Sequence, residues 1–216
     1  MIPEVNRYTH IFPDPLKATS EGLVAWGGDL DENRVMSAYF QGIFPWYNEN
    51  DPILWWSPDP RLVLYPKNLK ISKSLSKSIK KFEVRVDYDF DAVIRKCQSV
   101  RKKNGENTWI LDEIISCYKS LHDKGLAKSF GVYLDDELVG GLYGIDLGHT
   151  FCGESMFSEV SDASKVALVT LCEYCEKNSY HFIDCQIPSN HLLSMGAEIM
   201  SRKDFIETLK NLQYPQ

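Results

Sequence analysis

The chain has 216 residues, of which 44% are apolar, 25% charged and 12% aromatic, a globular composition that excludes a long disordered or collagen-like chain. No apolar run approaches the roughly 18 residues of a membrane span, and the first residues lack the basic and apolar regions of a signal peptide, so we expect a cytoplasmic protein without membrane contact. The net charge of −6 conceals a segregation: residues 67–103 hold 12 Lys and Arg against 4 Asp and Glu, whereas the remainder holds 12 against 26. Such a split favours a polyanion-binding face on an acidic body.

The N-terminal part is dense in turn residues and aromatics. Its prolines restrict regular structure to short pieces, such as a helix near Glu32–Gln41. Four of the five tryptophans of the chain lie here: Trp26, Trp46, Trp55 and Trp56. We expect a small N-terminal domain over residues 1–63 and a second domain over residues 64–216.

A basic helix is expected over Ile71–Phe82, with Ser72 as its N-cap. One stripe of this helix is apolar: Ile71, Leu75, Ile79 and Phe82. The opposite face carries a second stripe, formed by four lysines: Lys73, Lys77, Lys80 and Lys81. Like charges at this spacing destabilise a helix by about a few tenths of a kcal/mol per pair, and a merely solvated face would be better served by mixed signs. We therefore favour contact with phosphates over a solvated face.

The remaining elements form an ordered series of strands and helices. A strand is expected over Phe82–Asp87, followed by two helices, Phe90–Lys103 and Leu111–Lys124, with a break at Asn104-Gly105. Three antiparallel strands are expected next: Lys128–Leu134, Glu137–Asp146 and Thr150–Met156. The chain ends with a helix, a buried strand and a last helix: Ala163–Lys177, Tyr180–Ile187 and Arg202–Leu212. This order is that of the fold of acetyl-CoA-dependent N-acetyltransferases, and it predicts an α+β chain with a mixed, mostly antiparallel sheet flanked by helices.

Two polar residues interrupt the last expected strand. Asp184 and Gln186 are two positions apart, and side chains at i and i+2 point to the same side of a strand, so they would together bind and orient an ammonium group. Glu154 approaches Asp184 if the two strands are neighbours, and two close carboxylates raise one pKa and suit proton handling or cation binding. The alternative is a pair of separate surface acids.

The sequence contains no motif for several other kinds of catalysis. A G-x-S-x-G nucleophile elbow, a Walker A loop and a Rossmann G-x-G-x-x-G are all absent from the sequence, so covalent, ATP-driven or nicotinamide chemistry is not indicated. Six cysteines in a chain without a secretory signal favour reduced thiols. Cys172 and Cys175 have the spacing of half a zinc site or a redox pair, but no second pair accompanies them, and we expect no metal.

Several longer segments carry a resemblance that covers nearly the whole chain. They are GLVAWGGDL (Gly22–Leu30), AYFQGIFPW (Ala38–Trp46), PILWWSPDPR (Pro52–Arg61), NTWI (Asn107–Ile110), ELVGGLYG (Glu137–Gly144), FCGESMFS (Phe151–Ser158), ASKVAL (Ala163–Leu168) and FIDCQ (Phe182–Gln186). In this order the segments resemble the leucyl/phenylalanyl-tRNA-protein transferase family. The sequence departs from that family at Lys128 and Gly131, where a His and a Glu are usual.

The resemblance implies a small N-terminal domain packed on an acetyltransferase-like (GNAT) domain. It implies an aminoacyltransferase that moves Leu or Phe from Leu-tRNA or Phe-tRNA to the N-terminal Arg or Lys of acceptor proteins and so marks them for the N-degron pathway. No metal or nucleotide cofactor is implied, because the aminoacyl ester is already activated and positioning dominates. We expect direct attack by the α-amine without a covalent intermediate, and a monomeric enzyme.

The resemblance also implies roles for single residues. Asp184 and Gln186 would handle the amine, supported by Glu154 and contacted by Tyr39; the proton acceptor stays open, as does the alternative that Asp184 only orients Gln186 or the amine. Trp46 and Trp109 match positions that stack the terminal adenosine, worth about 1–3 kcal/mol. Further substrate-binding candidates, with core packing as the alternative, are Leu142, Phe151, Met156, Ser158, Leu168, Leu171 and Ile183.

Two other functions compete with this interpretation. An acyl-CoA N-acetyltransferase would share the fold, but its pyrophosphate loop is replaced here by Ser161–Lys165. A catalytically inert tRNA-binding module would use only the basic helix, and it predicts that Asp184→Ala leaves the biological activity unchanged.

Overall fold

The structure is a computed structural model that describes residues 1–103 and 108–213. The expected break at Asn104-Gly105 and Asn107 of the NTWI segment lie outside the described residues.

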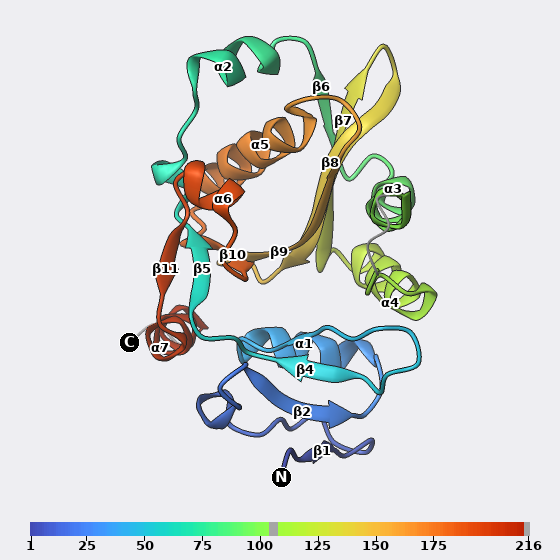
Figure 1. Ribbon diagram of the computed structural model, residues 1–216, viewed down its shortest axis with the longest axis vertical. Helices are drawn as coiled ribbons and strands as arrows, with labels where there is room; N and C mark the ends of the chain where they lie inside the picture. The colour runs from blue at the N-terminus through green and yellow to red at the C-terminus, as the bar shows by residue number, and fades with distance from the viewer. Residues whose placement is uncertain (104–107, 214–216) are drawn as a thin grey trace.

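The N-terminal part builds a small four-stranded sheet in the order β1-β2-β4-β3. Its strands are β1 (Glu4–Val5), β2 (Leu23–Gly27), β3 (Phe44–Pro45) and β4 (Leu54–Trp56). Helix α1 (Glu32–Phe40) begins after Asp31, whose carboxylate accepts hydrogen bonds from two backbone N–H groups of the first turn. Figure 1 shows α1 between this sheet and the larger part of the molecule.

A seven-stranded sheet in the order β11-β5-β10-β9-β8-β7-β6 forms the rest of the framework. Its strands are β5 (Arg61–Leu64), β6 (Glu83–Val86), β7 (Ala127–Leu134), β8 (Glu137–Asp146), β9 (Thr150–Ser158), β10 (Phe182–Gln186) and β11 (Glu198–Met200). In the described part, β9 and β10 run parallel and the other neighbours run antiparallel. The expected mixed, mostly antiparallel sheet is therefore confirmed. Strand β5 crosses the expected boundary between residues 63 and 64, and the division into domains stays a prediction.

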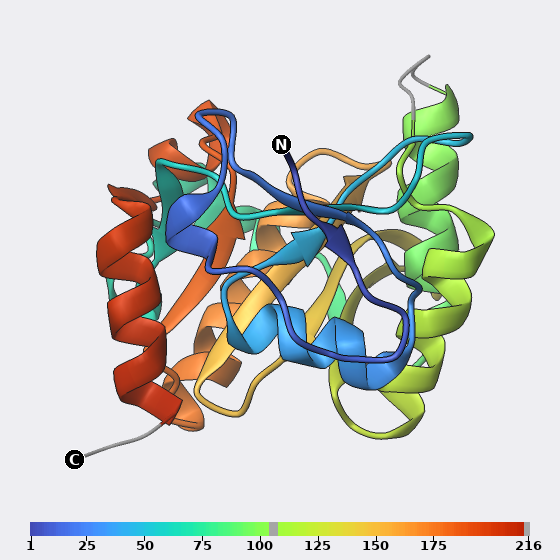
Figure 2. The ribbon, with the colours of Figure 1, turned by 90° about the horizontal axis from the view of Figure 1, so that it is seen from below.

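Helices cover both faces of the large sheet, each over its own hydrophobic core (Figure 1). One face carries α3 (Phe90–Lys103) and α4 (Asp112–Asp123), and the other carries α5 (Ala163–Lys177). Figure 2 shows α7 (Arg202–Gln213) on the flank opposite α3 and α4. Shorter pieces complete the chain: α2 (Lys73–Ile79), α6 (Asn190–Ser194) and two 3-10 turns at Pro15–Lys17 and Pro66–Asn68. None of the described helices combines the length and apolarity needed to cross a membrane.

The basic helix differs from its expected extent. Ser72 is the N-cap, as expected, and its Oγ accepts a hydrogen bond of 3.1 Å from the backbone N–H of Leu75. The helix ends at Ile79, however, because the chain turns there to enter β6. Ile71 precedes the cap and is 44% exposed, so its expected place in the apolar stripe of the helix is wrong.

Candidate active site

A cavity of about 620 Å³ lies where β9 and β10 separate. The two strands pair only at Phe182–Asp184 of β10, while β9 continues to Ser158 and leaves its edge open from Gly153 onward. The described residues that line the cavity are Phe44, Pro45, Trp46, Asn48, Arg101, Trp109, Leu142, Tyr143, Gly153, Glu154, Ser155, Met156, Leu168, Leu171, Ile183, Cys185, Gln186, Ile187, Ser189, His191 and Leu192.

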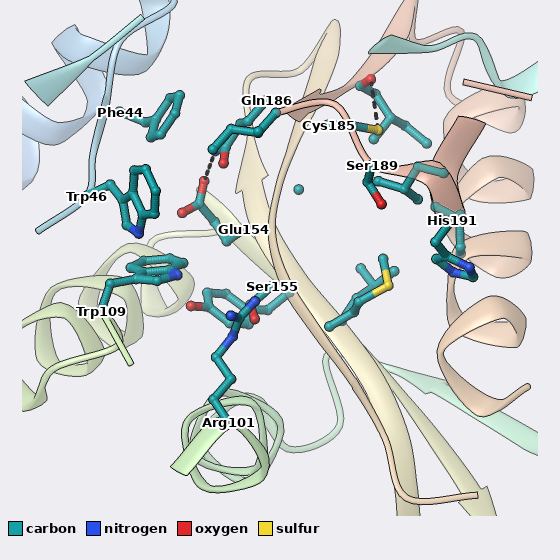
Figure 3. Close-up of a pocket in the computed structure, with 18 of the residues that line it drawn as sticks. Phe44, Trp46, Arg101, Trp109, Glu154, Ser155, Cys185, Gln186, Ser189 and His191 are labelled. Carbon is teal, nitrogen blue, oxygen red and sulfur yellow. Dashed lines mark hydrogen bonds between the residues drawn. The ribbon is translucent and has the colours of Figure 1, made fainter. Parts of the chain in front are cut away.

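A β-bulge presents Glu154 to the cavity. Tyr143 of β8 is opposite Ser155, but the next residue, Gly144, is opposite Gly153, so Glu154 is an extra residue in β9. A bulge of this kind re-aims a side chain, which explains why consecutive residues of β9 line the same cavity. Figure 3 shows the Glu154 carboxylate facing Gln186, whose Nε2 donates a hydrogen bond of 2.8 Å to Oε1.

The surroundings of Glu154 bring its pKa close to neutrality. Burial raises the pKa of this carboxyl from 4.5 to about 7, against the opposing effect of the nearby Tyr39 and Tyr118 hydroxyls. The Tyr118 hydroxyl donates to Oε2 at 3.1 Å and also hydrogen bonds to the Tyr39 hydroxyl. Tyr39 is only 2% exposed and does not line the cavity, so it contacts the site through this buried network.

Asp184 forms a buried ion pair instead of facing the cavity. Arg61 donates from Nε to Oδ1 at 2.8 Å and from Nη2 to Oδ2 at 2.6 Å, and both side chains are 1% exposed. Asp184 Oδ1 also accepts a hydrogen bond of 2.9 Å from the backbone N–H of Gln186. The carboxylate thus anchors the backbone from which the Gln186 side chain extends.

The expected joint projection of Asp184 and Gln186 from one face is wrong. Asp184 is opposite Val63 of β5 and Gln186 is opposite Leu62, so Cys185 is an extra residue between them. The two side chains therefore behave as strand neighbours and point to opposite faces, and Gln186 takes a φ of 63°. Gln186 lines the cavity and Asp184 does not.

Indoles form one end of the cavity. Trp46 is 41% exposed, and Trp109 faces it across the opening (Figure 3). Trp56 supports this end, because its ring packs edge-on against Trp46 at 5.9 Å and its Nε1 donates to the Trp46 carbonyl. Trp55 is fully buried, and its Nε1 donates a hydrogen bond to the Gly27 carbonyl.

Most of the expected apolar residues do line the cavity: Leu142, Met156, Leu168, Leu171 and Ile183. Phe151 does not, because it is fully buried against Phe130 in the core beneath α5. Ser158 does not either: its hydroxyl donates to the Val160 carbonyl and accepts from the backbone N–H of Ser164 at the start of α5. Both residues therefore have structural contacts in place of the expected contact with a substrate.

The basic residues divide into two groups. The four expected lysines are exposed on and just after α2, and none of them lines the cavity: Lys73, Lys77, Lys80 and Lys81. Arg101 at the end of α3 does line it, and sequence reasoning missed this residue although it belongs to the basic stretch. Also missed were Tyr143 and Ser155, which alternate with the recognised Leu142 and Met156 along their strands.

Within residues 1–103 and 108–213, no three His, Cys, Asp or Glu side chains are arranged to hold a metal ion. The six cysteines are unpaired, and burial raises the pKa of Cys172 to about 12, so this thiol is not activated as a nucleophile.

The element order and the mixed sheet, with a cavity where two parallel strands separate, place the chain in the N-acetyltransferase fold class. Family sequence profiles described as "Leucyl/phenylalanyl-tRNA protein transferase" and its N-terminal domain match residues 63–210 and 28–59. A leucyl/phenylalanyl-tRNA--protein transferase of Sulfurimonas denitrificans is 51% identical over 209 residues, covering 97% of this chain and 92% of that protein. One of Flavobacterium johnsoniae is 50% identical over 202 residues, covering 93% and 95%.

The chain therefore belongs to the leucyl/phenylalanyl-tRNA-protein transferase family, and it is an aminoacyltransferase. The resemblance found in the sequence is confirmed. Among solved structures, one from Clostridium acetobutylicum described as a predicted acetyltransferase with acetyl-CoA shows 13% identity and a TM-score of 0.40, covering 51% of this chain and 82% of that one. Similarity at that level supports no conclusion about activity.

Proposed function

We propose that the enzyme transfers leucine or phenylalanine from Leu-tRNA or Phe-tRNA to the α-amine of proteins that begin with Arg or Lys. The observation that carries this proposal is the composition of one cavity: an indole end for an adenine, an apolar wall for the amino-acid side chain, and a carboxylate–amide pair between them. An aminoacylated adenosine has a complementary group for each part of the cavity: an adenine, a leucine or phenylalanine side chain, and the ester between them. Stacking on the indoles would contribute about 1–3 kcal/mol.

The chemistry is a direct displacement at the ester. The neutral α-amine attacks the ester carbonyl, the new C–N bond forms, and the bond to the 3′-oxygen of the tRNA breaks. Gln186 Nε2 donates a hydrogen bond to Glu154. The side-chain carbonyl oxygen of Gln186 is then oriented to accept a hydrogen bond from the amine and to position the amine for attack. With a pKa of about 7, Glu154 is suited to take the proton from the amine and return it to the departing 3′-oxygen.

Asp184 and Tyr39 act through these two groups. Asp184 positions Gln186 by accepting its backbone N–H, and Arg61 holds the carboxylate in place. Tyr39 reaches Glu154 through the Tyr118 hydroxyl and fixes the buried side of the network. We thus assign the amine-handling role to Gln186 and Glu154, and a positioning role to Asp184 and Tyr39.

The start of α5 argues against acetyl-CoA as the acyl donor. Hydrogen bonds from Lys165 and then Ser78 lower the pKa of Asp162, so its carboxylate is ionised beside the helix N-terminus. A pyrophosphate bound there in the usual manner would lie beside the Asp162 carboxylate and would compete with it for Lys165. Transfer from tRNA leaves this end of α5 unused.

The exposed lysines of α2 and its C-terminal turn would hold tRNA phosphates without reading sequence: Lys73, Lys77, Lys80 and Lys81. Aminoacyl-tRNA is a cytoplasmic substrate, so we place the reaction in the cytoplasm, with the enzyme acting as a monomer. Acceptors that carry the added Leu or Phe would enter the N-degron pathway.

The test is transfer of labelled leucine from Leu-tRNA to a protein that begins with Arg, beside the same protein beginning with Met. Label on the Arg protein alone is expected. Glu154→Gln should abolish transfer, whereas Glu207→Gln, the same change at an exposed position on α7, should not. Equal labelling of both proteins, or none of either, would overturn the proposal.

A further inference from the structure

Strands β8 and β9 give the cavity two walls of opposite character. Leu142 is opposite Met156, and the next pair along the strands is Tyr143 opposite Ser155. Because successive side chains alternate between the faces of a sheet, the first pair lies on the α5 face and the second on the α3 face. All four residues line the cavity, which therefore reaches both faces of the sheet at the open edge of β9.

The wall on the α3 face contains a buried hydroxyl that has no hydrogen-bond partner among the described residues. Tyr143 is fully buried, and its hydroxyl makes no hydrogen bond within the described part of the chain. A buried hydroxyl that lacks a hydrogen-bond partner destabilises the protein, and a ligand that accepts from it would remove that cost. Burial raises the pKa of Tyr143 well above its usual range, so the hydroxyl keeps its proton and is available as a donor.

A cation lies on the same wall. Arg101 extends from the last turn of α3, and Figure 3 shows its side chain pointing toward the part of the cavity that Ser155 and Trp109 line. Its charge counteracts the rise in the pKa of Tyr143, which shows that the two groups are within electrostatic reach. The two residues that follow, Lys102 and Lys103, are exposed, so the chain is positive at this end of α3.

These donors match an oxyanion of high charge. A guanidinium presents paired N–H groups that fit phosphate oxygens, and hydrogen bonds to a charged group are stronger than those between neutral groups. Next to them is the indole end of the cavity, while the apolar wall that suits an aliphatic or aromatic side chain is on the other face. In an aminoacylated nucleotide, the phosphate and the acyl group leave the ribose from its opposite ends, at the 5′- and 3′-oxygens.

We propose that Arg101, Tyr143 and Ser155 bind the phosphate that joins the terminal adenosine of the tRNA to the preceding nucleotide. The inference rests on the proposed function and adds to it a phosphate subsite inside the cavity, apart from the exposed lysines of α2. The nucleic-acid strand then leaves the cavity past Lys102 at the basic end of α3.

The test uses a stable ligand, 3′-leucylamido-3′-deoxyadenosine, with either a 5′-hydroxyl or a 5′-methylphosphate, and measures binding by calorimetry. The wild-type enzyme should bind the phosphate ligand at least about ten-fold more tightly. Arg101→Gln should remove most of this preference and leave the affinity for the 5′-hydroxyl ligand unchanged. Arg95→Gln, the same substitution at an exposed position on the same helix, should change neither affinity.

A second variant distinguishes a contact of Tyr143 with the phosphate from a contact with the ribose 2′-hydroxyl. Tyr143→Phe should weaken only the phosphate ligand, by about several-fold, and should do so equally when the ligand lacks its 2′-hydroxyl. A penalty that disappears with the 2′-deoxy ligand would assign Tyr143 to the ribose and overturn its role here.

The remaining outcomes are distinct. Equal wild-type affinity for the two ligands, or equal loss of both in Arg101→Gln, overturns the phosphate subsite and leaves the proposed function standing. Failure of the wild-type enzyme to bind either ligand overturns the proposed function and the subsite together.

Discussion

Breaking the Arg61–Asp184 ion pair is expected to lower the stability of the fold and, as a consequence, to impair leucine transfer. The perturbation is Asp184→Asn, which keeps the shape of the side chain but removes its charge. Arg61 would then be a buried cation without its anionic partner, hydrogen bonded to the Gly42 carbonyl and packed 4.4 Å from the Phe205 ring centroid. The contacts with uncharged groups that remain do not compensate a charge at 1% exposure.

The size of the effect follows from this burial. Removing one partner of a buried pair costs about 3–5 kcal/mol. For a chain of this length each kcal/mol lowers the melting temperature by about 2–4 °C, so a fall on the order of 6–20 °C is expected. The exposed Lys203–Glu207 pair on α7 is the control, and Glu207→Gln should change the free energy of unfolding by less than about 1 kcal/mol.

The assay combines urea denaturation with leucine transfer for the single variant and for Arg61→Met with Asp184→Leu. Replacing both charges by apolar groups should restore most of the stability. A deficit of about 1–3 kcal/mol should remain, because the backbone N–H of Gln186 no longer has its acceptor. Transfer should stay impaired in the double variant, because the backbone N–H of Gln186 then lacks the carboxylate that anchors it.

Two results would refute this reasoning. An Asp184→Asn enzyme of wild-type stability that cannot transfer leucine would give Asp184 a direct role in the chemistry. A double variant with full transfer activity would show that Gln186 needs no anchoring by this carboxylate.

Three further predictions concern charge and stacking. The pKa of Glu154 is raised from 4.5 to about 7 in the folded state, so between these pH values the native protein retains a proton that the unfolded chain loses. The free energy of unfolding should therefore fall by about 3 kcal/mol as the pH rises from 4.5 to about 7. Urea denaturation at a series of pH values should show this fall, and a Glu154→Gln variant that shows the same fall would disprove the assignment to Glu154. Replacing Lys77, Lys80 and Lys81 by Ala should reduce the slope of log affinity for tRNA against log salt by about 0.7–0.9 for each phosphate that is no longer neutralised; an unchanged slope would exclude these lysines as phosphate ligands. Trp109→Ala should cost about 1–3 kcal/mol in binding of 3′-leucylamido-3′-deoxyadenosine, and an unaltered affinity in calorimetry would exclude stacking on this indole.

The sequence predicts the secondary structure well, because most of it follows from local patterns. Apolar residues at helical spacing predict α3 and α5 with the bounds found in the structure, and alternation predicts β8 in the same way. The end of α2 is missed, since the turn after Ile79 depends on where the chain must go to pair β6 with β7. That pairing is a long-range contact, which no local periodicity encodes.

The candidate site is hardest to predict where the strands depart from regular alternation. The two bulges, at Glu154 and at Cys185, decide which side chains reach the cavity. A strict two-residue period places the Asp184 side chain beside that of Gln186, whereas in the structure the Asp184 side chain points toward Arg61. Arg61 is 123 residues away in sequence, so nothing local identifies it as the partner. The family motifs contain Glu154, Asp184 and Gln186, but they do not distinguish a residue that lines the cavity from one that anchors its neighbour.

At Tyr143 the regular alternation of the strand is kept, but it does not reveal the role that we propose for this residue. It falls on the same face of β8 as Ile145, and both are fully buried, so its pattern is that of an ordinary core residue. What sets it apart is that its hydroxyl is unpaired within the described residues, whereas the hydroxyl of the neighbouring buried Tyr118 bonds to Glu154. A buried aromatic ring is encoded in the strand pattern, but the absence of a partner for its polar atom depends on the three-dimensional packing of the described chain. Comparing how the Tyr143→Phe variant binds the 5′-methylphosphate and 5′-hydroxyl ligands therefore tests the unpaired hydroxyl, which the sequence alone does not reveal.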